Sequence, residues 1–138
     1  MRRKNVWLVL IALSGQWFSP AVIAQSDPWI EIADTTGSTY SGRKGSFETS
    51  TNKNGTPIGL IRGQVFDKKT KRYDYQQWYV TQADCANGMG KLVVIDTAGE
   101  FKFDADFIAQ GKSAASAIAD MICALNQAAN AEKDGKGI

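Results

Sequence analysis

Few residues in this sequence are able to carry out covalent chemistry. Histidine, the commonest general base and metal ligand, is absent, and the only two cysteines are Cys85 and Cys123. Nucleophile systems that pair serine or cysteine with histidine are therefore excluded. A carboxylate pair such as Asp104 and Asp106 remains, and its alternative role is a solvated strand face. These observations predict a protein that is not an enzyme and that uses neither a metal nor a cofactor.

The two cysteines are predicted to form a structural disulfide. One disulfide is the usual arrangement for two cysteines in an exported chain, and two free thiols are the alternative. A bridge between Cys85 and Cys123 would close a loop of about 40 residues, which is worth roughly 4 kcal/mol through loop-closure entropy. The nearby glycines Gly88 and Gly90 precede a strand-like run rather than a helix. We therefore interpret them as points of backbone freedom and not as a phosphate-binding loop.

The first 24 residues have the layout of a secretory signal peptide. A positively charged start that includes Arg2 and Arg3 precedes a short apolar run over residues 6–13, and a small-residue cleavage site ends at Ala24. The apolar run is too short to span a bilayer. Residues 1–24 are predicted to be removed, and an uncleaved anchor is the alternative. Because Gln25 rather than cysteine follows the cleavage site, we expect no lipid anchor.

Charge and length limit the partners and the size of the fold. The chain has 16 basic and 14 acidic side chains, and residues 1–24 contain three of the basic ones and none of the acidic ones. The remainder has 13 basic and 14 acidic side chains, so a nucleic-acid partner lacks electrostatic support. No second apolar stretch is long enough to span a membrane. Residues 25–129 are predicted to form one domain, followed by a flexible tail over residues 130–138.

Short β-like runs separated by turn residues fill this domain as far as residue 107. We expect strands over residues 29–33, 38–41, 46–50, 58–66, 75–82, 91–96 and 100–107. Residues 37–56 would also fit a mobile loop. In the last run Phe101, Phe103 and Phe107 alternate with polar residues, which predicts a half-buried strand. Runs this close together leave no room for helical crossovers, so we expect an antiparallel meander of about six strands.

One long helical pattern follows, over residues 113–127. Ile118, Met121, Ile122 and Leu125 recur on one helical face, and Ser113 is a suitable N-cap. The predicted fold class is therefore α+β, with the antiparallel sheet packed on one C-terminal helix.

A basic hairpin tip is the candidate binding feature. Lys68, Lys69, Lys71 and Arg72 lie together and are followed by Tyr73. Such a tip would suit sulfated glycans, anionic lipid headgroups or an acidic protein surface. The alternative is a well-solvated hairpin end that lysines protect from edge-to-edge aggregation.

Several short motifs stand out along the chain: an N-terminal strand with Trp29, a Gly-x-x-Tyr run ending at Tyr40, the pair Trp78-Tyr79, Asp84-Cys85, and a closing helix with Cys123. Together they resemble the bacterial surface-adhesin protein E family. The resemblance implies an antiparallel meander on a C-terminal helix, with a disulfide between helix and sheet. It also implies a secreted or surface protein of the Gram-negative envelope that binds host matrix or serum proteins.

The sequence departs from this family at Gln25, where the namesake adhesin carries a lipidated cysteine. A soluble periplasmic role, as an accessory subunit or inhibitor of an envelope or secretion assembly, is therefore the alternative. In both cases the expected partner is a protein, either a host matrix protein or an envelope component. No binding residue of the family maps onto this chain.

Overall fold

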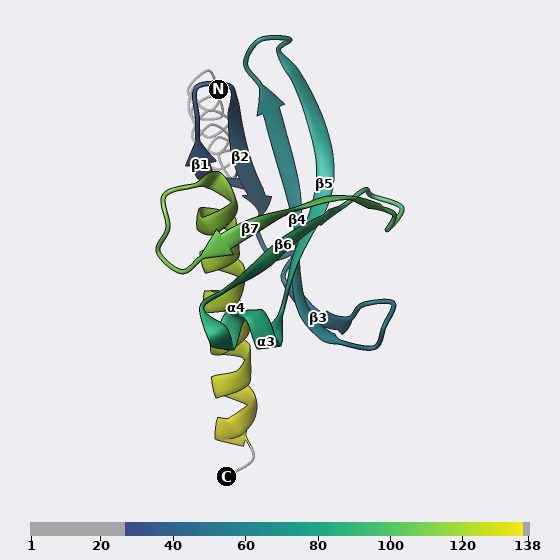
Figure 1. The fold of residues 1–138 in the computed structure, drawn as a ribbon, viewed down its shortest axis with the longest axis vertical. Helices are drawn as coiled ribbons and strands as arrows, with labels where there is room; N and C mark the ends of the chain where they lie inside the picture. Colours follow the sequence, from purple (N-terminus) through teal and green to yellow (C-terminus); the bar gives the residue numbers. More distant parts are fainter. Residues whose placement is uncertain (1–26, 137–138) are drawn as a thin grey trace, which may run out of the picture.

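The computed structural model describes residues 27–136, so the predicted signal peptide lies outside the described residues. Figure 1 shows that α4 lies along one side of a twisted sheet. In chain order the elements are β1 (Trp29–Asp34), β2 (Ser38–Arg43), β3 (Glu48–Thr51), β4 (Pro57–Asp67), β5 (Arg72–Thr81), α3 (Gln82–Asn87), β6 (Met89–Ile95), β7 (Phe101–Ile108) and α4 (Ala114–Lys136). None of the described helices is long and apolar enough to cross a membrane.

All the strand pairs are antiparallel, in the order β1-β2-β4-β5-β6-β7. The predicted fold class, an antiparallel sheet on a C-terminal helix with one disulfide, is confirmed. One connection departs from a simple meander, because β2 and β3 both pair with the same edge of the long strand β4. Residues 37–56 therefore contain two strands, and the mobile-loop alternative is wrong.

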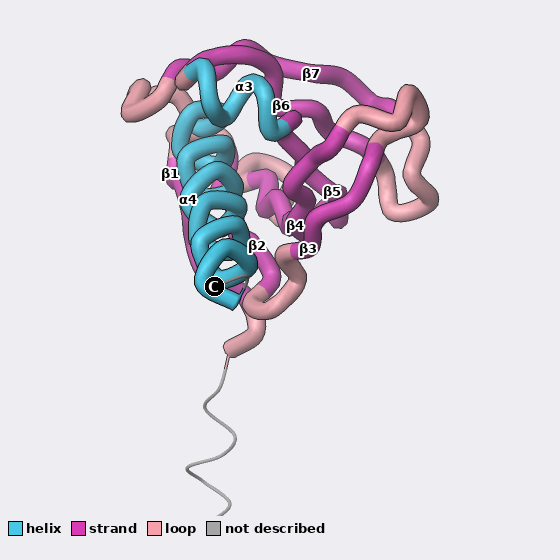
Figure 2. Tube along the Cα trace, turned by 90° about the horizontal axis from the view of Figure 1, so that it is seen from below, coloured by secondary structure: helices cyan, strands magenta, loops and turns pink. Residues whose placement is uncertain are grey.

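The core lies between α4 and one face of this sheet, which we call the covered face. In Figure 2 the turns of α4 run down the picture beside β1, with the sheet curving away from the helix. The helix buries Ile118 and Ile122 against Trp78 and Val80 of β5. Gly63 lies beneath the ring of Trp78, where any side chain at position 63 would overlap the ring. A glycine in β4 thus lets a large aromatic side chain lie close to the sheet.

A polar chain connects this core to the surface. The indole Nε1 of Trp78 donates to Oε1 of Gln76 at 2.8 Å, and Nε2 of Gln76 donates to Oδ2 of Asp74 at 2.7 Å. Nζ of Lys102 also reaches Asp74, at 3.1 Å. The hydrogen bond from Gln76, together with the nearby ammonium of Lys102, lowers the pKa of Asp74. The buried Gln76 amide is therefore satisfied at both ends, as a packed core requires.

Two helical boundaries differ from expectation. Ser113 caps α4 as predicted, since its Oγ accepts a hydrogen bond from Ser116 N at 3.0 Å. The helix then continues to Lys136, so the predicted end at Gln127 is wrong, and residues 130–136 of the expected tail are helical. Three further alanines beyond Gln127 favour this continuation, at positions 128, 129 and 131.

The short helix α3 was not predicted. The strand expected over residues 75–82 ends at Thr81 instead. Thr81 caps the helix by accepting a hydrogen bond from Asp84 N at 3.1 Å, and Gly88 ends it with a φ of 76°.

The apolar face of β7 is only partly buried. Phe107 is 5% exposed, but Phe101 and Phe103 are 62% and 50% exposed. The expectation of a continuous half-buried face is therefore wrong at the start of the strand. A register shift between Val94 and Ile95 lies there, and the β6–β7 turn projects away from α4 (Figure 1).

Candidate functional site

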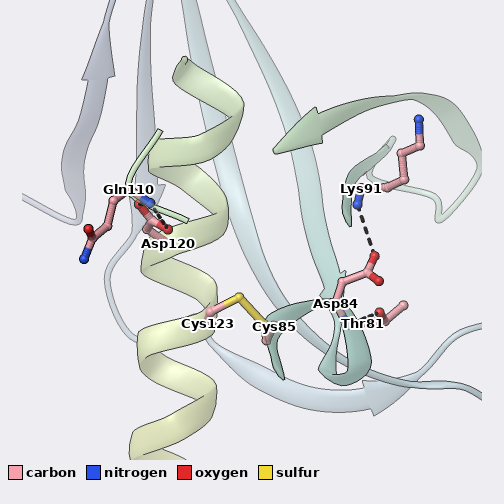
Figure 3. Close-up of a disulfide and its surroundings, with 7 residues drawn as sticks. All are labelled: Thr81, Asp84, Cys85, Lys91, Gln110, Asp120 and Cys123. Atoms are coloured by element: carbon pink, nitrogen blue, oxygen red, sulfur yellow. Dashed lines mark hydrogen bonds between the residues drawn. A yellow bond between two sulfur atoms is a disulfide. The ribbon is translucent and has the colours of Figure 1, made fainter. Parts of the chain in front are cut away.

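The disulfide is a structural link between the two helices. Figure 3 shows Cys85 on α3 joined to Cys123 on α4, with a Cα–Cα distance of 5.4 Å. The predicted pairing is confirmed. Two acidic side chains around it accept hydrogen bonds from backbone N–H groups. Asp84 Oδ2 accepts from Lys91 N at 3.1 Å, and the Asp120 carboxylate accepts from Gln110 N at 3.0 and 3.2 Å. This region fastens α4 to the rest of the fold.

The described residues include no group of three or more histidine, cysteine or carboxylate side chains that could hold a metal ion. The carboxylates considered in the sequence, Asp104 and Asp106, are both exposed on β7. Asp106 forms an ion pair with Lys91, and the hydrogen bond in this pair raises the pKa of Lys91. The geometry therefore places Asp106 in a surface ion pair on the exposed strand.

The basic hairpin tip does not present four equivalent charges. Lys68 Nζ lies 2.9 Å from Asp34 Oδ1 and donates to Thr35 O at 2.7 Å, so it ties the β4–β5 hairpin to the β1–β2 turn. The other basic residues of the tip, Lys69, Lys71 and Arg72, are exposed and form no ion pair among residues 27–136.

Tyr73 belongs to a row of aromatic rings on the sheet face that α4 does not cover, which we call the open face. Its ring lies 4.8 Å from Phe66 and 6.5 Å from Tyr75, and Tyr75 lies 5.9 Å from Trp29 (centroid distances). Tyr73 and Tyr75 are about half exposed. The row crosses from β1 to the β4–β5 hairpin and connects the tip to the middle of the sheet.

Two adjoining hollows continue along the open face. One, of about 460 Å³, is bordered by Trp29, Arg43, Arg62 and Tyr75. The other, of about 550 Å³, has an apolar floor and a polar rim supplied by the β3 hairpin. Both are bordered by Gln77, and we call them together the trough. The apolar residues that line its second hollow are Ile58, Leu60, Tyr79, Ile95 and Phe101.

The trough lies on the side of the molecule away from α4. In Figure 1 the β3–β4 turn and the β6–β7 turn both project on that side. Glu48 and residues 50–54 of the β3 hairpin form one wall, and Gly99 and Phe101 of the β6–β7 hairpin form another. Phe101, which was expected to be half-buried, is thus part of the second wall.

The binding residues predicted from sequence include Tyr73 but not Arg43, Arg62 or Tyr75. The signal for Tyr75 was present: tyrosines at positions 73, 75 and 79 fall on one face of β5 by the two-residue alternation of a strand. The arginines come from strands whose pairing the sequence did not establish.

No known protein family, characterised protein or solved structure matches this chain. The resemblance to surface adhesins therefore stays a prediction.

Proposed function

We propose that this protein is an exported, non-enzymatic module that binds another protein through its open face. The observation that carries the proposal is the trough, where an apolar floor is combined with exposed aromatic rings and arginines. Protein interfaces are enriched in tyrosine, tryptophan, phenylalanine and arginine, and their apolar centre is surrounded by a polar rim.

The exposed aromatic side chains support this choice of face. Tyr73, Tyr75 and Phe101 are 50% to 62% exposed and belong to the aromatic row or the trough, whereas Phe103 is the one such ring that belongs to neither among the described residues. A grouped set of exposed aromatic residues marks an interaction site more strongly than single exposed residues do.

Export is supported by the layout of residues 1–24 and by the disulfide, because stable disulfides belong to oxidising compartments. The resemblance to surface adhesins favours a host matrix or serum protein as partner. A periplasmic accessory subunit or inhibitor would use the same open face on an envelope component.

Binding is tested with the full coding sequence, expressed with its own N-terminal segment and purified after export. Immobilised protein is exposed to host matrix proteins and to envelope extract. We expect Tyr75→Ser combined with Phe101→Ser to lose the captured partner. Met89→Ser changes a similarly exposed residue at the start of β6 that does not line the trough, and this variant should retain the captured partner. Equal capture by both variants would refute the open face as the binding surface.

The location is tested separately, by labelling intact cells with a membrane-impermeant reagent. Labelling supports a surface adhesin. Protection from the label, with labelling after the outer membrane is opened, supports the periplasmic alternative.

A further inference from the structure

We propose that Arg43 and Arg62 form a carboxylate-binding site in the trough, and that the partner segment there is an extended acidic peptide. This inference rests on the proposed function and specifies the chemistry of the partner. Gly42 pairs with Gly63 across β2 and β4, so Arg43 and Arg62 occupy the next facing positions. Both side chains are exposed, and both border the smaller hollow.

The two guanidinium groups have no acidic partner within the described part of the chain. The described ion pairs are formed by Lys68, Lys91 and Lys102. The strands β1 and β3 carry three acidic residues: Asp34 pairs with Lys68, and neither Glu31 nor Glu48 forms an ion pair with either arginine. Like charges that face each other across strands lower stability. Two unpaired arginines side by side are therefore a cost that an anionic ligand would remove.

The side chain of Arg43 and the backbone of both arginines are also held in place. The guanidinium carbon of Arg43 lies 5.7 Å from the centre of the Trp29 ring, within the range of a cation–π interaction. Ser46 fixes the backbone beneath both residues, because its Oγ donates to Arg43 O at 2.8 Å and accepts from Arg62 N at 3.0 Å. A site that is ordered before binding loses less entropy when the ligand arrives. Arginine suits a carboxylate because its planar group donates two parallel hydrogen bonds.

The rest of the trough indicates a peptide rather than a glycan. Ile58, Leu60 and Arg62 are two residues apart on the same face of β4, and Ile58 and Leu60 line the apolar floor. Aliphatic floors accept apolar side chains, whereas sugar rings stack on flat aromatic surfaces. The rings of Trp29 and Tyr75 are inclined by 43° and form no such flat surface.

The spacing predicts the order of side chains in the ligand. Two residues of an extended strand span about 7 Å, at about 3.3 Å per residue. An extended peptide with an acidic residue and an apolar residue two positions apart would place the carboxylate at the arginines. Its apolar side chain would then lie over Leu60.

The test uses the full-length exported protein and a bead library of random short peptides. We expect enrichment of sequences in which an acidic and an apolar residue are two positions apart. For the most enriched synthetic peptide, Arg43→Gln and Arg62→Gln should each weaken binding about tenfold, as should replacement of its acidic residue by the amide. Combining a protein variant with the amide peptide should add little further loss, because both remove the same interaction.

Lys69→Gln and Lys71→Gln are the matched controls, since they remove the same charge from the hairpin tip. Their affinities should stay within about twofold of the original protein. The Arg→Gln variants should unfold at the same temperature as the original protein or a higher one, so that a loss of binding reports the site and not the fold.

The outcomes separate this inference from the proposed function. Peptides that depend on Tyr75 and Phe101 but show no acidic preference would overturn the carboxylate site and leave the open face intact. Binding lost in the lysine variants alone would overturn it in favour of the tip. Heparin binding through Arg43 and Arg62, with no peptide enriched, would replace the peptide by a sulfated glycan. No enrichment and no captured protein would overturn both proposals.

Discussion

The two faces of one sheet use aromatic side chains in opposite ways. On the covered face Trp78 is 1% exposed, its N–H is bonded to Gln76 and its ring lies over Gly63. On the open face Tyr75, three residues earlier on the same strand, is 50% exposed and adjoins Trp29. Because successive side chains of a strand point to opposite faces, one aromatic segment supplies both a buried core residue, Trp78, and a surface residue, Tyr75.

The position of α4 decides which half is which. The helix buries the side chains of the covered face, whereas among residues 27–136 no helix packs on the trough. Aromatic residues left exposed in a group are costly in water unless they meet a partner. The comparison therefore makes separate predictions for stability and for binding.

The largest expected effect is from removal of the buried aromatic ring. Trp78→Ala should lower the free energy of unfolding by about 4–5 kcal/mol, because it creates a cavity and leaves Gln76 without its indole partner. Tyr75→Ala should lower it by less than about 1 kcal/mol, since half of this ring already faces water. Urea unfolding of both variants gives the comparison. Similar losses would show that the two faces do not differ as described.

Loss of the disulfide should come next. Cys85→Ser and Cys123→Ser should each lower the free energy of unfolding by up to about 4 kcal/mol, because the open chain regains the entropy of the loop. The double variant should lose no more than either single one. Where the fold persists, partner binding by the open face should be unchanged, because the disulfide lies beside α4.

Thermal unfolding and binding of the three serine variants measure both predictions. Additive losses would mean that the two cysteines contribute separately. A parallel loss of affinity in folded protein would mean that the covered face controls the open one.

The smallest effect concerns Asp74, whose pKa is lowered in the folded protein. The ionised carboxylate therefore stabilises the fold above about pH 4, and this contribution is lost as the carboxylate is protonated at lower pH. Asp74→Asn keeps an acceptor for Gln76 but removes the charge. It should lower the free energy of unfolding at pH 7 by well under about 1 kcal/mol, because the group is mostly exposed.

Asp74→Asn should also make the loss of stability between pH 5 and pH 2 shallower. The pKa values of Asp34 and Asp67 are lowered too, so part of that loss should remain. Urea unfolding across this pH range is the measurement, and an unchanged slope would contradict the assignment.

The features with local physical causes were predictable from sequence. The period of Ile118 and Ile122 predicted the buried side of α4, and the apolar run of β6 predicted a strand between two others. The helix α3 also has a local signal, a threonine cap with an acidic residue three positions later, but the strand pattern before it was extended too far.

The features that depend on strand pairing were not predictable. Arg43 and Arg62 are 19 residues apart and become neighbours only because β2 and β3 share one edge of β4. Phe101 lies beyond a register shift in the β6–β7 pair, where Val94 pairs with Phe103 but the next residue, Ile95, pairs with Phe101. A single strand pattern contains neither fact, so the trough could not be assembled from the sequence.

The junction at Ser46 has a consequence for how this fold can diversify. The side chain of Ser46, and not a neighbouring strand, satisfies the backbone N–H of Arg62. The length of the segment between β2 and β3 is therefore not fixed by the sheet ladder. Insertions that leave Ser46 and the core-packed Phe47 in place would reshape the β3 wall of the trough while β2 and the helix-packed core keep their register. Ser46 and Phe47 thus mark the two points at which this segment is fastened to the rest of the fold.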